Sequence, residues 1–377
     1  MSNLSMNFTV DKNAVVCNML NGEIQGRMKS RKNPTLKQAY RESGIIDSTP
    51  AITSFIVSHP RIFGNEKLIH RDGSNFFEGI LPLYSSQSGA SCKESLKTRI
   101  AVQYDLTDAE MQGMDTFLDD FQTLADLPEI QKIVSDTEDY KKSIEEAWNA
   151  SAPSIMKYVT DVLGYEPEIT SKVNAYIMYP TFDIHRCSQE NNRTSLFFAR
   201  RKDNNIHKIL SYLAHQAVHQ PMLPYKSSMT KQEKEVYHAF IKFLTDKDVY
   251  SQLSGKSYLD IVTQDENPEA MGKVYPFWLG YRYRKDSNAV EEIKNAIQRD
   301  KEYYEQLPQN SKKRKLYSTY EFEKLDPEKI ANLFKERRGI TPYQFAKIDF
   351  SKKELVYTEK ALEDRKKAKD SGEYDVR

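Results

Sequence analysis

The sequence predicts an α+β fold, because helical and strand-like segments occupy separate blocks along its 377 residues. Apolar residues recur at three- and four-residue spacing over about 107–164, which is typical of helices that bury one face. The spacing then changes, since 171–182 and 193–200 are short and rich in β-branched and aromatic residues, as strands are. The helical period returns at 206–220. A chain of this length has room for two or three domains.

The ends of the chain differ in composition from its middle. Residues 1–50 are polar and without a clear period, and 51–90 mix short apolar runs with glycine and proline. We expect irregular structure in the first segment and strands and loops in the second. We therefore place an N-terminal region at 1–90 and a central domain at 91–285. The remainder, 286–377, is highly charged, and we expect helices and a flexible tail there.

Two later helices carry clear end signals. Thr230 precedes one of them, and Glu233 three residues on completes the pattern of a capping box. Asp326 and Pro327 have the residue types that favour the start of another helix, and Gly339 is suited to follow its end. These signals indicate where the two helices begin and where the second one ends.

The composition excludes several classes of protein. Lysine plus arginine number 55 against 54 aspartate plus glutamate, so no excess charge would attract nucleic acid or anionic lipid. Cys17, Cys92 and Cys187 form no C-x-x-C pair, which argues against a disulfide framework or a cysteine zinc site. No apolar run is long enough to cross a bilayer, and no Sec-type signal is visible. We expect a cytoplasmic protein without membrane insertion, or one exported by another route; the oligomeric state is not indicated.

The segment "IHKILSYLAHQAVHQ" at 206–220 carries two histidines four residues apart. His215 and His219 fall on one polar side of the expected helix, close enough to share a tetrahedral metal ion. Solvent-facing histidines on an ordinary helix are the alternative explanation, because H-x-x-x-H also occurs by chance. The apolar residues form a continuous stripe on the opposite side, typical of a helix that faces a core: Ile206, Ile209, Leu210, Leu213, Ala214, Ala217 and Val218.

The order of elements around this helix adds to the motif. Helices over 107–164, strands near 171–182 and 193–200, the helix with "HQAVH" and a helix after Thr230 follow one another. In this order, and in the two histidines, about half of the chain resembles the zincin superfamily of zinc metallopeptidases, specifically its gluzincin branch. The resemblance implies a zincin-like core with a small sheet, a Zn²⁺ cofactor and a protein or peptide substrate.

The third metal ligand that the resemblance implies is a glutamate on the following helix, often within E-x-x-x-A. The sequence "EVYHA" fits that pattern and places Glu235 in the ligand position. A solvated helix glutamate is the alternative for Glu235, and its interval from His219 is shorter than in many members of the family. His238 competes with it, either as the third ligand or as a donor to the transition state.

Gln216 occupies the position where H-E-x-x-H has its glutamate. In zincins that glutamate accepts a proton from the zinc-activated water and returns it to the leaving amine. A glutamine takes no proton at accessible pH, so peptide hydrolysis should fall by roughly 10²–10⁴-fold while metal binding survives. Gln216 is either natural, in a pseudo-enzyme that still binds a peptide, or an engineered replacement of glutamate. The otherwise complete motif favours replacement slightly.

Two further elements would complete such a site. The strand "SLFFAR" at 195–200 is the candidate edge strand, along which an extended peptide would pair. The segment "YRYR" offers Tyr281, Arg282 and Tyr283 as donors to an oxyanion. An aromatic core segment around Trp278 is the alternative role for most of these residues.

Three hypotheses about function follow. The first is a zinc metallopeptidase whose metal is held by His215, His219 and Glu235, with Gln216 in the position of the base. The second is a zincin-like protein without activity that binds a protein or peptide partner. The third is a helical protein that binds no metal. Bound zinc separates the third from the others, and peptidase activity of the Gln216→Glu variant separates the first from the second.

Overall fold

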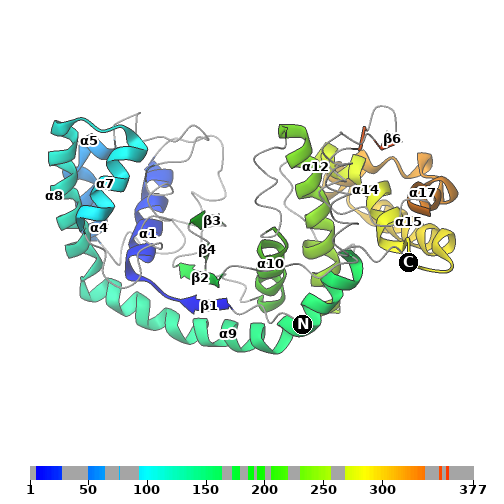
Figure 1. The fold of residues 1–377 in the computed structure, drawn as a ribbon, viewed down its shortest axis with the longest axis horizontal. Coiled ribbons are helices and arrows are strands. Elements are labelled where there is room, and N and C mark those ends of the chain that lie inside the picture. Colours follow the sequence, from blue (N-terminus) through cyan, green and yellow to red (C-terminus); the bar gives the residue numbers. More distant parts are fainter. Residues whose placement is uncertain are drawn as a thin grey trace, which may run out of the picture. The chain divides into compact units, whose positions relative to one another are not determined.

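The computed structural model of the chain is mostly helical and contains a small four-stranded sheet (Figure 1). The coarse prediction of an α+β fold is therefore confirmed. The structure describes residues 6–27, 50–63, 76, 93–163, 172–178, 186–190, 193–199, 205–219, 230–255, 268–335, 348–349 and 354–355.

The chain divides into two compact units. We call Asn3–Asn149 with Thr170–Asn205 the sheet unit, and Met1–Ser2 with Ala150–Ile169 and Ile206–Arg377 the helical unit. The boundary between them falls inside a single long helix, α9 (Pro128–Leu163). The limits of these two units differ from those of the three predicted parts of the chain, 1–90, 91–285 and 286–377. The division into three parts stays a prediction.

The sheet has the strand order β1-β2-β4-β3, with parallel pairing of β1 with β2 and of β2 with β4. β3 joins β4 in the antiparallel sense. Alternate residues of β2 are buried, namely Val173, Ala175 and Ile177, as expected for a strand with one face on a core. The bounds of the four strands are β1 Met6–Thr9, β2 Lys172–Met178, β3 Arg186–Glu190 and β4 Arg193–Ala199.

The two strands predicted near 171–182 and 193–200 are present as β2 and β4, but β4 is not an edge strand. Its residues pair with β2 on one side and with β3 on the other. The backbone groups of β4 are therefore already engaged, and no extended peptide can add to them. The prediction that "SLFFAR" offers a free edge was wrong.

The helices of the sheet unit pack around one apolar core. Phe117 and Phe121 on α8 are fully buried and contact Phe55 on α4, with ring centroids 5.5 and 6.5 Å apart. Burying one such ring contributes roughly 1.5–3 kcal/mol to stability. A capping box of Thr107 and Glu110 fixes the start of α8. Besides the first part of α9, the helices are α1 Lys12–Arg27, α4 Pro50–Ser58, α5 Pro60–Phe63, α7 Lys93–Tyr104 and α8 Asp108–Ala125.

Two predictions for the N-terminal region were wrong in its described part. Residues 1–50 were expected to be irregular, but they contain β1 and α1. Residues 51–90 were expected to form strands and loops, whereas the segment beginning at Pro50 is the helix α4. Its buried residues, Ile52, Phe55 and Ile56, have helical spacing, so their packing outweighs the strand preference of isoleucine.

The helical unit holds the histidine motif. Its helices, with the π-helical segment η3 and two short 3₁₀ turns, are α10 Ile206–His219, α12 Lys231–Lys242, η3 Phe243–Val249, α13 Tyr250–Ser254, α14 Pro268–Tyr283, α15 Ala289–Gln306, α16 Lys312–Tyr317, η4 Ser318–Tyr320, η5 Phe322–Lys324 and α17 Pro327–Lys335. A short hairpin, β5 Ile348–Asp349 and β6 Glu354–Leu355, follows.

The predicted helix starts are confirmed. The Thr230 hydroxyl accepts a hydrogen bond from the backbone N–H of Glu233 at 3.2 Å, and the Glu233 carboxylate accepts one from Thr230 at 2.7 Å. The Asp326 carboxylate accepts from the N–H groups of Glu328 and Lys329 at the start of α17. Gly339, the predicted stop after α17, lies outside the described residues.

Close packing fixes α14 against its neighbours. Gly272 has no room for a side chain, because a Cβ there would lie 2.3 Å from the carbonyl oxygen of Thr319. Gly280 likewise brings α14 against Phe334 of α17. Trp278 between them is buried and contacts Phe240 of α12 edge to face. The aromatic segment around Trp278 is thus part of the core of the helical unit. This is one of the two roles that the sequence left open for it.

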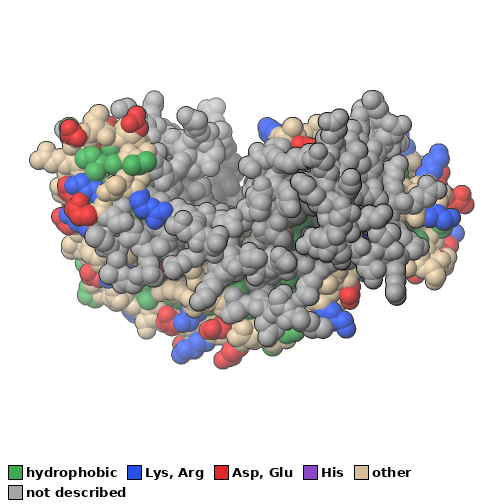
Figure 2. All heavy atoms as spheres, in the orientation of Figure 1, with side chains coloured by type: hydrophobic (Ala, Val, Ile, Leu, Met, Phe, Trp, Pro, Cys, Tyr) green, Lys and Arg blue, Asp and Glu red, His purple; other side chains and the backbone are tan. Residues whose placement is uncertain are grey.

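The described surface carries both signs of charge. Figure 2 shows lysine and arginine side chains interspersed with aspartate and glutamate over the part of this face that is described, in keeping with the counts of 55 and 54. Within the described ranges, no helix combines the length and the apolar content that a bilayer crossing requires.

Candidate metal centre

The helix α10 is buried on more sides than its sequence indicates. The predicted apolar stripe faces the core, and only Ile206 at its start is half-buried. The polar side is covered as well, because the Ser211 hydroxyl donates to the carbonyl of Thr245 on η3 at 2.8 Å. His215 is consequently buried, with 5% of its surface exposed, and His219 is half-buried. Solvent-facing histidines, the alternative explanation of the motif, are ruled out for His215.

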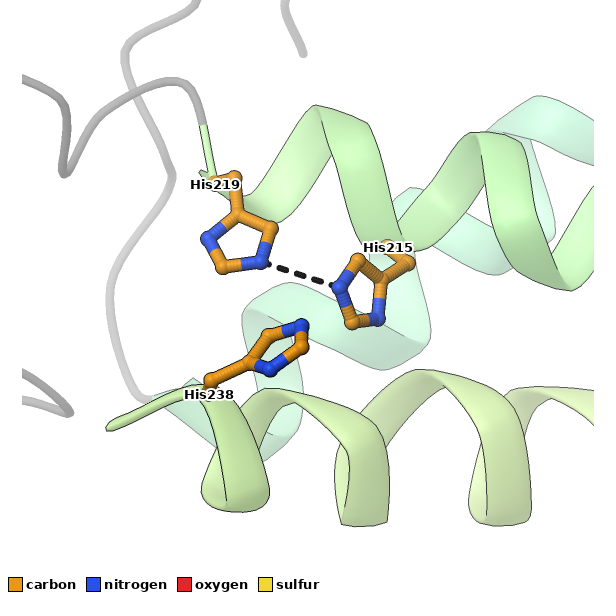
Figure 3. A group of neighbouring side chains, drawn as sticks. All are labelled: His215, His219 and His238. Carbon is orange, nitrogen blue, oxygen red and sulfur yellow. Dashed lines mark hydrogen bonds between the residues drawn. The ribbon is translucent and has the colours of Figure 1, made fainter. Parts of the chain in front are cut away.

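His215 and His219 turn toward each other, and His238 of α12 joins them (Figure 3). The Nε2 atoms of His215 and His219 lie 2.9 Å apart. One ring nitrogen from each of the three residues lies within 4.8 Å of the others. On a tetrahedral zinc ion, with Zn–N bonds of about 2.0–2.1 Å, two imidazole nitrogens lie roughly 3.3 Å apart. Small side-chain movements would therefore bring all three nitrogens onto one ion.

The Asp246 carboxylate and the Thr245 hydroxyl, both on η3, contact Nδ1 of His215. The Nδ1 atom of His215 lies 3.2 Å from Asp246 Oδ1 and 3.0 Å from the Thr245 hydroxyl. An ionised carboxylate only accepts hydrogen bonds, so Nδ1 carries a proton, and in the neutral imidazole Nε2 then keeps its lone pair. A metal-binding histidine is typically held in this way, with its second nitrogen donating to a carboxylate. The arrangement leaves Nε2 of His215 able to bind a metal.

The charge of Asp246 fits this role. Burial raises its pKa, but the nearby His215, the hydrogen bonds from His215 and Thr245 and the charge of Lys242 together lower it below the ordinary value. Asp246 is therefore ionised at neutral pH and accepts from Nδ1. Its position on a π-helical segment is notable, because such segments are rare and often occur at functional sites.

The predicted ligand Glu235 is not part of the histidine group. It is half-buried and lies on α12, three residues before His238, which is the third member of that group. Glu233 caps the helix, as the sequence indicated. Gln216 is buried on α10 beside His215, with 9% of its surface exposed. Whether Glu235 binds a metal and whether position 216 holds a base both stay predictions.

The three candidate oxyanion donors have other contacts in the structure, and whether they donate to an oxyanion stays a prediction. Tyr281 is fully buried and donates to the Leu163 carbonyl at 3.0 Å, and burial raises its pKa. The Nε atom of Arg282 pairs with Asp248 Oδ2 at 3.3 Å. Tyr283 lines a separate cavity together with Arg282 and Asp248. Tyr281 is therefore part of the aromatic core, which is the alternative role that the sequence left open for it.

Thr245 and Asp246, which contact Nδ1 of His215, were not predicted from the sequence. Their only sequence signal is the stretch of four polar residues, Thr245–Asp248, between the apolar residues of the helical run "FIKFLTDKDVY". Polar residues within such a run are buried and need partners, so they indicate a network.

No protein-family model matches the chain, and no curated protein or solved structure has significant similarity to it. The kind of site is therefore inferred from its own residues. They are three imidazoles from two helices, with a carboxylate next to Nδ1 of one of them.

Proposed function

We propose that His215, His219 and His238 together bind one divalent transition-metal ion, and that the ion is zinc. The observation that carries the proposal is the convergence of three imidazole nitrogens within 4.8 Å from two separate helices. Imidazole donors suit zinc, copper, nickel and iron, and a tetrahedral set with an open position is typical of zinc.

A hydrogen bond between two histidines would explain part of the geometry without a metal. Such a bond accounts for the 2.9 Å between His215 and His219, with one proton shared between them. It gives no reason for His238, from another helix, to bring a third ring nitrogen to the same point. The Asp246 carboxylate behind His215 supports the metal further, because it fixes the tautomer that binds through Nε2.

Three protein ligands leave one position of a tetrahedral ion open. A bound zinc ion would supply Lewis acidity there and lower the pKa of a coordinated water. The protein's own residues would orient the ligands; His215 and Gln216 are buried, whereas His238 is exposed and leaves the centre accessible to solvent on that side. We therefore propose that the chain is a metal-dependent hydrolase, or a binding protein built around the same metal centre.

Zinc-dependent hydrolysis of a protein or peptide is the candidate reaction, and the place of position 216 favours it. Gln216 lies on the buried helix directly after His215, where a zincin has its catalytic glutamate. With glutamine there, the chain should be inactive or impaired by roughly 10²–10⁴-fold. Binding a peptide without cleaving it is the alternative.

Elemental analysis of protein purified without chelator tests the metal proposal. We expect about one zinc per chain, and its loss in the His215→Ala and His238→Ala variants. His207→Ala is the matched control, because His207 lies on the same helix but outside the histidine group. Zinc kept in His238→Ala but lost in Glu235→Ala would replace our ligand set with the one that the zincin resemblance implies. No bound metal in the unaltered chain would refute both.

The Gln216→Glu variant tests the reaction. Cleavage of a peptide library by this variant, and no cleavage when His215→Ala is added, would support a metallopeptidase. If the Gln216→Glu variant binds zinc but cleaves no peptide, the peptidase proposal is wrong. Binding of a peptide without cleavage is then the remaining proposal.

A further inference from the structure

The helical unit contains a cavity that the three histidines do not line. Residues of α9, η3, α13, α14 and α15 surround it, and its volume is about 160 Å³. An engineered cavity of about 150 Å³ holds benzene, so this one has room for roughly six or seven non-hydrogen atoms. The cavity is therefore large enough for a small organic ligand.

Two arginines of the lining, Arg282 on α14 and Arg299 on α15, meet at the same tyrosine. The guanidinium of Arg282 lies 5.4 Å from the centre of the Tyr283 ring, and Arg299 donates a hydrogen bond to the Tyr283 hydroxyl. All three residues line the cavity. The charged ends of both arginines, and not only their stems, therefore lie beside one residue of the lining.

These groups can be reached by a ligand. Arg299 is exposed, Tyr283 is half-buried, and the Arg282 side chain is 29% exposed. Burial and the charge of Asp248 raise the pKa of Tyr283, so its hydroxyl accepts from Arg299 and still has its own proton to donate. Each guanidinium has five N–H donors. Two guanidiniums and a hydroxyl suit a carboxylate, which only accepts hydrogen bonds.

Asp248 is the group with which such a ligand would compete. Its Oδ2 lies 3.3 Å from Nε of Arg282 and accepts a hydrogen bond from the Tyr158 hydroxyl at 3.0 Å. Burial raises the pKa of Asp248 to about 7, opposed by the charge of Arg282, the hydrogen bond from Tyr158 and the charge of Lys247. At neutral pH roughly half of the chains therefore have Asp248 protonated. In these chains Asp248 no longer balances the charge of Arg282, and an anion can do so instead.

The surrounding charges favour one monovalent anion. Asp300 is buried, and Asp286 acts on Arg282 but is exposed, so solvent screens it. Once Asp248 is protonated, three positive charges are left against two negative ones. Within the described ranges, the charged groups that act on Asp248 or Arg282 or share the lining with them are Arg282, Arg299, Lys247, Asp300 and Asp286.

We propose that this cavity binds a small monovalent carboxylate at Arg282, Arg299 and the Tyr283 hydroxyl, and that Asp248 takes up a proton from solvent as the ligand binds. The ligand then replaces Asp248 as the partner of Arg282, and the cavity gains no net charge. Three apolar residues of the lining suit a short carbon chain better than an inorganic oxyanion, namely Trp278, Leu279 and Ala296.

Isothermal titration calorimetry on the full chain at about pH 6.5 and constant ionic strength tests the ligand class. Acetate, propionate and butyrate are the carboxylate probes, and 1-butanol and n-butylamine replace the carboxylate by a neutral and a cationic group. We expect at least one carboxylate to bind with a Kd below about 10 mM, and the two replacements to bind at least about tenfold more weakly. Binding of no carboxylate, or tighter binding of inorganic phosphate than of any carboxylate, would overturn the proposal.

The pH dependence tests the proton uptake. Between about pH 7 and 8.5 the affinity should fall about tenfold or more, because the complex needs Asp248 protonated and its pKa is about 7. Asp300, whose pKa is about 6, stays ionised throughout this range. Asp248→Asn should bind the carboxylate equally well at both pH values. Affinity of the unaltered chain that does not change with pH, or a change that Asp248→Asn keeps, would refute the role of Asp248.

Variants assign the binding to this cavity. Arg299→Gln and Tyr283→Phe should each weaken the carboxylate about tenfold or more. Lys294→Gln is the matched control, because it removes the same charge from an exposed position of α15 that does not line the cavity. Unchanged affinity in both Arg299→Gln and Tyr283→Phe would refute the site. Binding should persist in His238→Ala, so that this proposal and the metal proposal succeed or fail separately.

Discussion

Replacing Asp246 should weaken metal binding without touching a metal ligand. Its Oδ1 lies 3.2 Å from Nδ1 of His215, and we propose that it orients this histidine and makes it a better donor. Loss of such a carboxylate typically costs about 10- to 100-fold in metal affinity, equivalent to about 1.4–2.8 kcal/mol. The Asp246 side chain is 30% exposed, so solvent screens part of its charge.

The two replacements at this position should differ. Asp246→Asn keeps an oxygen that can accept from Nδ1 and loses only the charge, so we expect a loss near tenfold. Asp246→Ala also removes the acceptor, and the loss should approach about 100-fold, limited because the Thr245 hydroxyl at 3.0 Å can take over part of the contact. Asp161→Asn, an exposed change in the same unit, is the matched control.

Competition with a chromophoric zinc chelator measures these affinities directly. An Asp246→Ala variant that binds zinc within about twofold of the unaltered chain would show that the carboxylate does not support a metal ligand. The reasoning from the Nδ1 contact to a metal-binding Nε2 would then be refuted.

Three further predictions concern the fold and its charges. Gly272→Ala should destabilise the helical unit by about 1–3 kcal/mol in urea denaturation, since its Cβ would meet the Thr319 carbonyl oxygen at 2.3 Å. Phe117→Ala should cost about 3–5 kcal/mol through the cavity it leaves in the core of the sheet unit, while zinc content stays the same. Burial raises the pKa of Asp248 to about 7, so the folded chain holds a proton that the unfolded chain releases near pH 4. Its contribution to stability should therefore fall as pH rises from about 4 to 7, by up to about 1.4 kcal/mol per pH unit. Asp248→Asn should remove this part of the slope, while the part due to Asp300, whose pKa burial raises to about 6, should remain.

Each of these has an outcome that contradicts it. A Gly272→Ala variant as stable as the parent would mean that α14 does not approach Thr319 closely. Loss of zinc in Phe117→Ala would tie the metal centre to the core of the other unit. A slope between pH 4 and 7 that Asp248→Asn leaves intact would place the titration elsewhere.

Long periodic helices could be predicted from the sequence, and short or distant elements could not. The helices α8, α9, α10 and α12 each repeat an apolar pattern over several turns, and two of them begin with a capping box. By contrast, β1 pairs with β2, so Met6 lies opposite Val173. A contact between residues so far apart in the sequence leaves no local pattern. β3 is a different case, because it pairs with the neighbouring β4, with Glu190 opposite Arg193, and turns β4 from an edge strand into an interior one. Its sequence "RCSQE" is mostly polar and has no strand pattern, so it was not predicted.

The candidate site could be predicted only in part, for a related reason. The spacing of His215 and His219 on one helix is a local property, and the structure brings them together as expected. The third position depends on how α12 is rotated about its axis against α10, which its buried residues decide. Glu235 and His238 lie three residues apart on that helix, and the sequence left both open. The packing brings His238 to the pair.

X-ray absorption spectroscopy of the zinc-loaded chain tests the three-histidine metal centre, because it reports the number and kind of atoms bound to the metal. We expect about three imidazole nitrogens at about 2.0–2.1 Å and one oxygen, and one imidazole fewer in His238→Ala. Two imidazoles in the unaltered chain, with no change in His238→Ala, would contradict the three-histidine centre.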